Sequence, residues 1–137
     1  MVDRGINKKM SVIKHINKHI TYECIEVRYN PQRKLRIESF ETKTEALIRN
    51  YLRRTEKIYL TKTQKNSKIF KYKNYNFKFS SGIPDYFYKE NKSNHTFIEM
   101  KNIKTDGISF NQFEWIRNNP YVKVRIIFAD IIKDLRI

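Results

Sequence analysis

The amino-acid sequence predicts one α/β domain with a mixed central β-sheet flanked by helices. Helical apolar spacing and strand-like alternation succeed one another along 137 residues, a length that suits a single domain. A helix predicted after Ser109 separates two strand-like segments, and a right-handed crossover through such a helix makes the two strands parallel. Hydrophobic residues make up 39% of the chain, which suits a packed core and argues against a disordered chain.

The first forty residues carry one helical pattern and two strand patterns. Residues 7–20 place apolar side chains on one side and lysines on the other, which predicts an amphipathic helix. Residues 21–29 and 35–40 have strand composition around a polar turn, which predicts a β-hairpin with Arg33 and Lys34 at its tip. The sequence leaves open whether this piece clamps DNA, forms a dimer contact or adds an edge to the sheet.

The middle of the chain predicts a helix and a lysine-rich hairpin. Residues 42–52 have apolar positions at helical spacing. Residues 62–78 alternate lysines with Phe and Tyr at the strand period of two, with Asn74 near the middle, so one face can join the core while the other meets phosphates. Together with Arg33 and Lys34, the side chains expected to bind nucleic acid are those of Lys62, Lys65, Lys68, Lys71, Lys73 and Lys78.

The C-terminal third predicts a hairpin, a helix and a final strand. Aromatic and β-branched residues fill 86–89 and 95–101, and the cluster between them has turn-forming composition. A helix follows Ser109, and residues 121–128 have the composition of a buried strand. The expected apolar face of that helix comprises Phe110, Phe113 and Ile116, with Trp115 beside it.

Two carboxylates and a lysine lie at the ends of the predicted 86–101 hairpin. Asp85 precedes its first strand and Glu99 lies near the end of the second, so antiparallel pairing makes them neighbours. Strand alternation places Glu99 and Lys101 on one face and turns the side chain of Met100 to the other. Mg²⁺ prefers one or two carboxylates with further oxygen ligands, and Asp85, Glu99 and the carbonyl of Met100 offer such a set. A bound Mg²⁺ or Mn²⁺ would polarise a phosphodiester and acidify a water, which Lys101 would orient or deprotonate.

These residues resemble the PD-(D/E)xK nuclease superfamily and, within it, the virus-type replication-repair nuclease (VRR-NUC) domain. The resemblance runs through Ser-Gly-Ile-Pro-Asp at 81–85, Phe-Ile-Glu-Met-Lys-Asn at 97–102 and Ile-Ser-Phe-Asn-Gln-Phe-Glu-Trp at 108–115. It covers roughly residues 40–130 and implies a restriction-endonuclease-like core, divalent-metal dependence and phosphodiester hydrolysis. The matching catalytic positions are Asp85, Glu99 and Lys101. The alternative is a surface hairpin with an incidental Glu99/Lys101 pair.

The resemblance also implies a glutamate from the helix that precedes the sheet, and a glutamine near the site. Glu45 is the candidate carboxylate and metal ligand, although Thr42-x-x-Glu45 is also a capping box that only ties down the start of a helix. Glu41 is the reserve candidate. Gln112 belongs to a second capping box, Ser109-x-x-Gln112, and its amide would also bond a metal-bound water or the DNA backbone.

The charge of the chain predicts a polyanionic partner. The formal net charge is +15, and residues 1–80 hold 20 of the 29 Lys and Arg residues but 7 of the 14 acidic ones. This half therefore carries +13 and is expected to supply the field that attracts phosphate. Lysines that only keep the protein soluble are the alternative.

Other functional classes find little support in the composition. No apolar run approaches membrane-spanning length, and lysines interrupt any signal-peptide pattern near the N-terminus, so we expect no membrane partner. Cys24 is the single cysteine, which excludes an intrachain disulfide and a cysteine zinc site. A reducing intracellular compartment is the expected location.

We therefore expect one nuclease domain over residues 1–137, with a basic extension at 1–40 and the PD-(D/E)xK core at 41–130. The expected function is that of a Mg²⁺- or Mn²⁺-dependent DNA endonuclease, structure-specific for Holliday junctions or other branched DNA in recombination or repair. A homodimer would supply two cuts. The alternatives are a sequence-specific restriction or homing-type endonuclease and a catalytically silent nucleic-acid-binding module.

Overall fold

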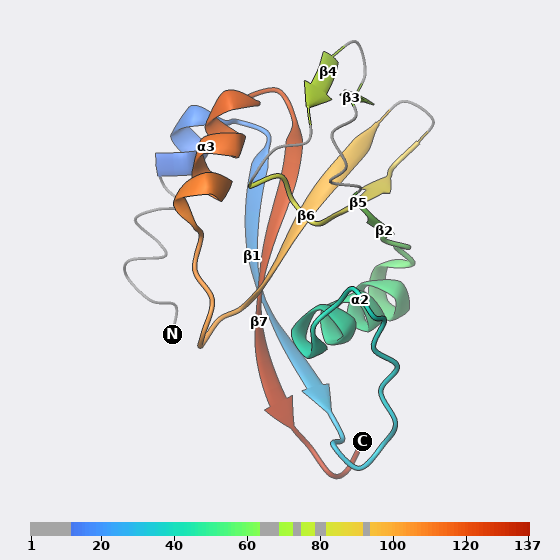
Figure 1. Cartoon of the computed structure of the whole chain (residues 1–137). Coiled ribbons are helices and arrows are strands. Elements are labelled where there is room, and N and C mark those ends of the chain that lie inside the picture. The colour runs from blue at the N-terminus through green and yellow to red at the C-terminus, as the bar shows by residue number, and fades with distance from the viewer. Residues whose placement is uncertain (1–11, 64–68, 73–74, 79–81, 92–93) are drawn as a thin grey trace.

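The computed structural model describes residues 12–63, 69–72, 75–78, 82–91 and 94–137, with 69–72 and 75–78 described as backbone only. Within these residues, five strands form one mixed sheet in the order β1-β7-β6-β5-β2, and β3 and β4 form a separate hairpin (Figure 1). The strands are β1 (Ile20–Tyr29), β2 (Thr61–Lys62), β3 (Ile69–Tyr72), β4 (Tyr75–Lys78), β5 (Tyr86–Lys89), β6 (His95–Asn102) and β7 (Lys123–Lys133). The helices are α2 (Lys43–Glu56) and α3 (Phe110–Asn118), and residues 12–16 are also helical.

The order of the strands confirms the α/β architecture with a mixed sheet. Strands β1, β7 and β6 run parallel, whereas β5 is antiparallel to both β6 and β2. Helix α3 connects β6 with β7, so the predicted crossover between parallel strands is confirmed. The hairpins predicted within 62–78 and 86–101 are confirmed as β3–β4 and β5–β6. Strand β7 continues beyond the predicted end at residue 128 because its pairing with β1 extends to Lys133.

Strands β6 and β7 are buried on both faces. Phe97 of β6 and Ile126 of β7 pack into a core with the α3 side chain of Trp115, whereas Ile98 and Ile127 pack into a second core beneath α2. Figure 1 shows α2 on one side of the sheet and α3 with the N-terminal helical segment on the other. The alternation of the strand side chains therefore assigns each residue of β6 to one helix.

The predicted N-terminal hairpin is wrong. Strand β1 pairs in parallel with β7, from Ile20 opposite Val124 to Tyr29 opposite Lys133, and residues 34–38 belong to no strand. Pairing with β7 lets the alternate side chains of β1 join the core beneath α2, which an isolated hairpin would leave in water. Of the three roles left open for this piece, the structure shows an added edge of the sheet.

Two boundaries also differ from the expected ones. The predicted helix over 7–20 is helical at 12–16 and ends at Asn17, a fully buried side chain that donates to the carbonyls of Asn119 and Val122. The part before residue 12 lies outside the described residues. Phe110 was expected on the apolar face of α3 but is 74% exposed, because Trp115 and Ile116 face the core from the side of the helix opposite to it.

Arg125 joins four elements on the α2 side of the sheet. Its guanidinium, on β7, donates to both carboxylate oxygens of Glu23 on β1 at 2.7 Å each, and to Glu56 at the end of α2 at 3.2 Å. It also donates to the hydroxyl of Tyr88 on β5 at 3.2 Å. This cation therefore ties the edge strand and the helix to the centre of the sheet.

We expect Arg125→Met to lower the free energy of unfolding by about 2 kcal/mol, because Glu23 and Glu56 lose their shared partner while both are partly covered. Urea denaturation followed by circular dichroism measures the change. Arg28→Met is the matched control, because Arg28 forms exposed pairs with Glu26 at 2.8 Å and Asp134 at 3.5 Å, and its loss is expected to cost less than about 1 kcal/mol. Equal losses in the two variants would contradict a special role for Arg125.

Candidate active site

The candidate site lies where β5 and β6 separate. Their pairing ends at Tyr86 opposite Ile98, whereas β6 continues beside β7 to Asn102. Continuing the register by one residue sets Asp85 opposite Glu99, as antiparallel pairing predicts. The carbonyl of Asp85 accepts from the amide of Thr63 at 2.8 Å, which holds the start of β5 against the segment after β2.

The backbone carbonyl of Met100 points to the edge of β6 that pairs with β5 earlier along the strand. The amide of Ile103 donates to Ala129 on β7 at 3.0 Å, so odd-numbered residues here direct their backbone groups to β7. Backbone groups alternate between the two edges of a strand, so those of Met100 face away from β7. The amide of Asn102 follows the same alternation and donates to the carboxylate of Asp106 at 2.8 Å. The Met100 carbonyl is thus an oxygen donor on the same edge as Asp85.

Glu99 and Lys101 share one face of β6, as predicted, and both are buried against α3. Residue exposure is 5% for Glu99 and 8% for Lys101. The ammonium of Lys101 donates to Oε1 of Gln112 at 2.8 Å, and Nε2 of Gln112 donates to Oε2 of Glu99 at 3.2 Å. The Lys101 ammonium and the Glu99 carboxylate are 3.9 Å apart. One side-chain amide therefore bridges the two charges and holds them at this separation.

Gln112 also caps α3, which confirms the predicted capping box and places the same side chain beside Glu99 and Lys101. Its side-chain Oε1 accepts from the backbone amide of Ser109 at 2.9 Å, and its backbone amide donates to the Ser109 hydroxyl at 3.1 Å. With two donors on its carbonyl oxygen, the amide group has a defined orientation, with its nitrogen toward Glu99. The first turn of α3 therefore fixes the side-chain amide of Gln112, which Glu99 and Lys101 both contact.

Gly82 brings the loop that carries Asp85 against the same helix. Its φ of +92° lies in the region that favours glycine. A Cβ here would collide with the backbone carbonyl of Asn111 and lie 2.8 Å from the amide nitrogen of Gln112. Ile83, the next residue, is buried in the core beneath α3. The Gly-Ile-Pro-Asp segment is thus pressed onto the first turn of α3, which locates Asp85.

Glu45 lies beside Tyr86 on the other side of the sheet. Its Oε1 accepts from the amide of Thr42 at 2.8 Å, which completes the predicted capping box, and from the hydroxyl of Tyr86 at 3.5 Å. Burial, together with the charges of Glu45, Glu41 and Asp85, raises the pKa of the Tyr86 phenol. Tyr86 packs beneath α2, whereas Glu99 contacts α3.

No cluster of three or more His, Cys, Asp or Glu side chains suited to a metal forms within the described ranges. The role of Glu45 as a ligand beside Asp85 and Glu99 therefore stays a prediction. The oxygen donors at the separation of β5 and β6 are the carboxylates of Asp85 and Glu99 and the carbonyl of Met100. Hard oxygen donors of this kind suit Mg²⁺, which retains several waters beside one or two carboxylates.

Glu41, the reserve carboxylate, forms an ion pair with α2. Its side chain is 0% exposed and accepts from Arg49 at 2.7 Å and 3.1 Å, and from the amide of Glu38 at 2.9 Å. Burial by itself would raise the pKa of Glu41, but the hydrogen bonds from Arg49 and Glu38 outweigh it and lower that pKa. Glu41 thus anchors the loop before α2 to the helix.

The lysines and arginine expected to bind nucleic acid are in different situations. The Lys62 ammonium lies 4.7 Å from the ring centroid of Tyr86 and 5.6 Å from that of Phe40, so these rings already hold it. Arg33 and Lys34 are exposed in the turn after β1. Lys71 and Lys78 lie on β3 and β4, where only the backbone is described. The remaining three, Lys65, Lys68 and Lys73, lie outside the described residues.

Searches against protein-family models, curated proteins and solved structures found no match to this chain. None of the helices in the described ranges has the length and apolar character needed to span a membrane.

Sequence reasoning missed the contact between Gly82 and α3. Its one signal is that glycine is scarce, with three in the whole chain, and that Gly82 immediately precedes Ile-Pro-Asp.

Gly82→Ala is expected to lower the free energy of unfolding by about 3 kcal/mol, from left-handed strain and from the clash with Asn111. Thermal and urea denaturation measure this loss. Gly107→Ala is the control, because a Cβ there meets nothing within 4 Å, and we expect a change below about 1 kcal/mol. If Gly82→Ala were as stable as Gly107→Ala, the close packing of the loop on α3 would be wrong.

The Glu41–Arg49 pair predicts a pH-dependent contribution to stability. Because folding lowers the pKa of Glu41, its contribution is present above the ordinary value of 4.5 and is lost as the pH falls through the folded-state pKa. The stability difference between the wild type and Glu41→Gln should therefore be largest at neutral pH and shrink below pH 4.5. Urea unfolding from pH 7 to pH 3 tests this, with the exposed Glu26→Gln as control. A constant difference would contradict it.

Proposed function

We propose that this chain is a divalent-metal-dependent DNA endonuclease of the PD-(D/E)xK superfamily, related to the VRR-NUC domain. The observation that carries the proposal is the buried Glu99–Gln112–Lys101 arrangement at the point where β5, with Asp85 at its start, leaves β6. Burying a carboxylate and an ammonium is costly, and a surface hairpin with an incidental pair would leave both in water. Lys and Glu are seldom buried this deeply, so the pair marks a candidate functional site.

The proposed chemistry divides among the residues as follows. Asp85, Glu99 and the Met100 carbonyl would hold Mg²⁺ or Mn²⁺, which polarises the scissile phosphate and acidifies a water. Lys101 stands on the same face as Glu99, where it orients that water or offsets charge on the phosphate. Gln112 sets the position of the lysine. Glu45 is a helix cap in the structure, and a role for it as a further ligand remains a prediction.

DNA is the proposed substrate because the chain is strongly basic. A net charge of +15 favours a polyphosphate, and residues 62–78 carry six lysines and no acidic residue. Branched DNA such as a Holliday junction is the preferred form, cut by a homodimer that supplies two sites. Specific duplex sequence, as for a restriction or homing-type endonuclease, is the alternative substrate. The alternative of another class is a silent binding module.

The test is cleavage of four-way-junction, flap, linear-duplex and single-stranded DNA in Mg²⁺, Mn²⁺ or EDTA. We expect cutting only with a divalent metal, and a loss of at least about a hundredfold in rate for Asp85→Asn and for Glu99→Gln. Glu114→Gln is the matched control, because Glu114 is a carboxylate of the same helix that pairs with Arg117. The preferred substrate separates the junction-specific role from the sequence-specific one.

Two further outcomes have a defined meaning. Tight DNA binding without cutting of any substrate would contradict the endonuclease and favour the binding module. Full activity of Glu45→Gln would leave Glu45 as a helix cap alone, whereas a loss comparable to that of Glu99→Gln would assign it to the metal. Light scattering of the protein with and without a junction measures whether two copies act together.

A further inference from the structure

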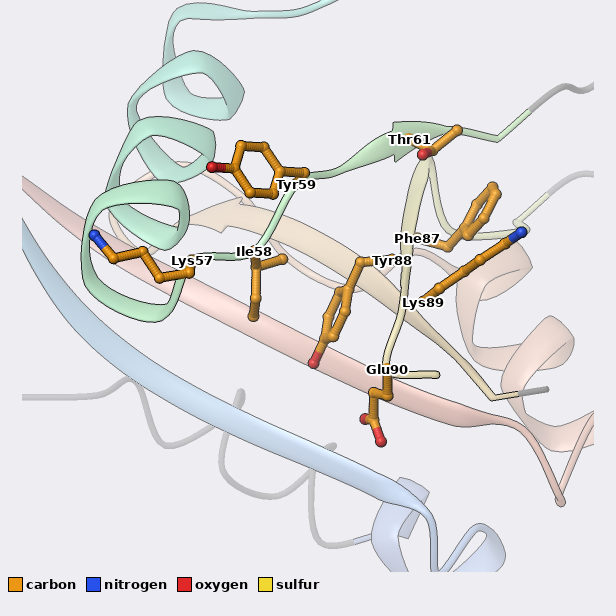
Figure 2. A pocket seen from close by; sticks show the side chains of 8 residues that line it. All are labelled: Lys57, Ile58, Tyr59, Thr61, Phe87, Tyr88, Lys89 and Glu90. Atoms are coloured by element: carbon orange, nitrogen blue, oxygen red, sulfur yellow. The ribbon is translucent and has the colours of Figure 1, made fainter. Parts of the chain in front are cut away.

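A pocket of about 670 Å³ lies at the outer edge of the sheet, beside β2 and β5. Strand β2 pairs with Tyr86 and Phe87 only, so beyond Phe87 the outer edge of β5 has no strand partner among the described residues. Figure 2 shows Ile58 and Tyr59, from the segment after α2, on one side of the pocket and side chains of β5 on the other. The short edge strand therefore leaves a hollow next to exposed strand backbone.

Aromatic rings and lysines line this pocket. Tyr59, Phe87 and Tyr88 contribute rings, and Lys57 and Lys89 flank the pocket from opposite sides with their ammonium groups turned outward (Figure 2). The Tyr59 residue is 68% exposed, and the guanidinium of Arg53 lies 5.7 Å from the centroid of its ring. An exposed ring backed by a cation offers a stacking surface to a planar, electron-rich group.

The acidic residues near the pocket are neutralised by partners of their own. Glu90, which lines it, accepts from the Lys123 ammonium at 2.9 Å on both oxygens, and from the Thr96 hydroxyl at 2.6 Å. The hydrogen bond from Thr96, followed by those from Lys123, lowers the pKa of Glu90, which favours its charged form. Lys57 and Lys89, in contrast, form no ion pair with any residue that the structure describes. The charge available to a ligand is therefore positive.

The pocket and the candidate active site are at opposite ends of the same short strand. Asp85 precedes β5, and Tyr88 follows it by three residues, a separation of about 10 Å in extended chain. A DNA strand whose phosphate lies at Asp85 can therefore reach Tyr88 and Tyr59 within a few nucleotides. A base that enters the pocket has to leave its stack with the neighbouring bases, which costs least for an unpaired nucleotide.

We propose that this pocket binds an unpaired nucleotide of the substrate, with the base stacked on Tyr59 and its phosphates bound by Lys57 and Lys89. The proposal rests on the proposed nuclease function and specifies its substrate class as branched DNA with unpaired nucleotides next to the scissile bond, as at a flap or at the opened centre of a junction. Aromatic stacking combined with a cationic groove is how proteins bind single strands without reading sequence. An extended acidic peptide at the open edge of β5 is the competing occupant, and the test below separates the two.

The test measures binding of a short fluorescein-labelled deoxythymidine oligomer and of a blunt duplex of equal length, in EDTA so that no DNA is cut. Tyr59→Ala should weaken binding of the oligomer about tenfold and leave binding of the duplex unchanged. Tyr59→Phe, which keeps the ring, should bind like the wild type. Tyr121→Ala is the matched control, since Tyr121 is a comparably exposed tyrosine, at 60%, located after α3.

A second measurement examines the lysines. Replacing Lys57 and Lys89 with Gln should reduce the slope of log affinity against log salt by about 0.7 for each lysine with the oligomer. Stacking should quench the fluorescence of a bound oligomer that carries 2-aminopurine, and among these variants only Tyr59→Ala should lose this quenching. Melting curves of each variant check that the fold is intact, and the exposure of Tyr59 predicts no change.

The outcomes distinguish this proposal from the nuclease proposal. Oligomer binding that depends on Tyr59, in a protein that cuts no DNA, would support the pocket and overturn the nuclease. Metal-dependent cutting with unchanged oligomer binding in Tyr59→Ala would overturn the pocket and leave the nuclease standing. An equal loss of affinity for oligomer and duplex in Tyr59→Ala would also overturn the pocket proposal. Binding of an acidic peptide that a competing oligomer does not displace would overturn it as well.

Discussion

The burial of β6 and β7 on both faces is the constraint on which the rest of the structure depends. Strands with no solvent-facing side require a helix on each side, and α2 and α3 meet that requirement with separate cores. Glu99 and Lys101 occupy positions of β6 that a purely structural strand would fill with apolar residues. They are tolerated because the amide of Gln112 reaches down from α3 and bonds to both. The candidate site is thus a polar break in an otherwise apolar layer.

Helix α3 connects this break to the loop in front of β5. Its first turn carries Gln112, and the backbone of the same turn is the surface against which Gly82 packs. One short helix therefore positions Asp85, through the loop, and Glu99 and Lys101, through the amide. Preorganisation of this kind is what a metal-dependent phosphodiesterase would need, because its donors must converge before substrate arrives. Strand β5 extends the arrangement to the aromatic pocket at its other end.

Much of this organisation was predictable from local patterns. The capping boxes at Thr42/Glu45 and Ser109/Gln112, the two hairpins and the shared face of Glu99 and Lys101 depend on residues close in sequence, and the structure confirms them. The crossover between β6 and β7 also followed, because a helix between two strands leaves few topologies. The prediction of an N-terminal hairpin failed because the composition of residues 21–29 indicates a strand but does not indicate which strand it pairs with.

The sequence by itself therefore determined where α2 and α3 begin, that β5, β6 and β7 are strands, and which side chains share a face of β6. The tertiary structure decided that β1 joins β7, and that Glu45 on α2 contacts Tyr86 on one side of the sheet while Glu99 contacts α3 on the other. It further decided that Arg125 binds Glu23 and Glu56 from distant segments. It also decided that the shortness of β2 leaves a pocket beside Tyr59. The physical reason is range, because caps and alternation act over a few residues, whereas these pairings depend on burial between segments that are far apart in the chain.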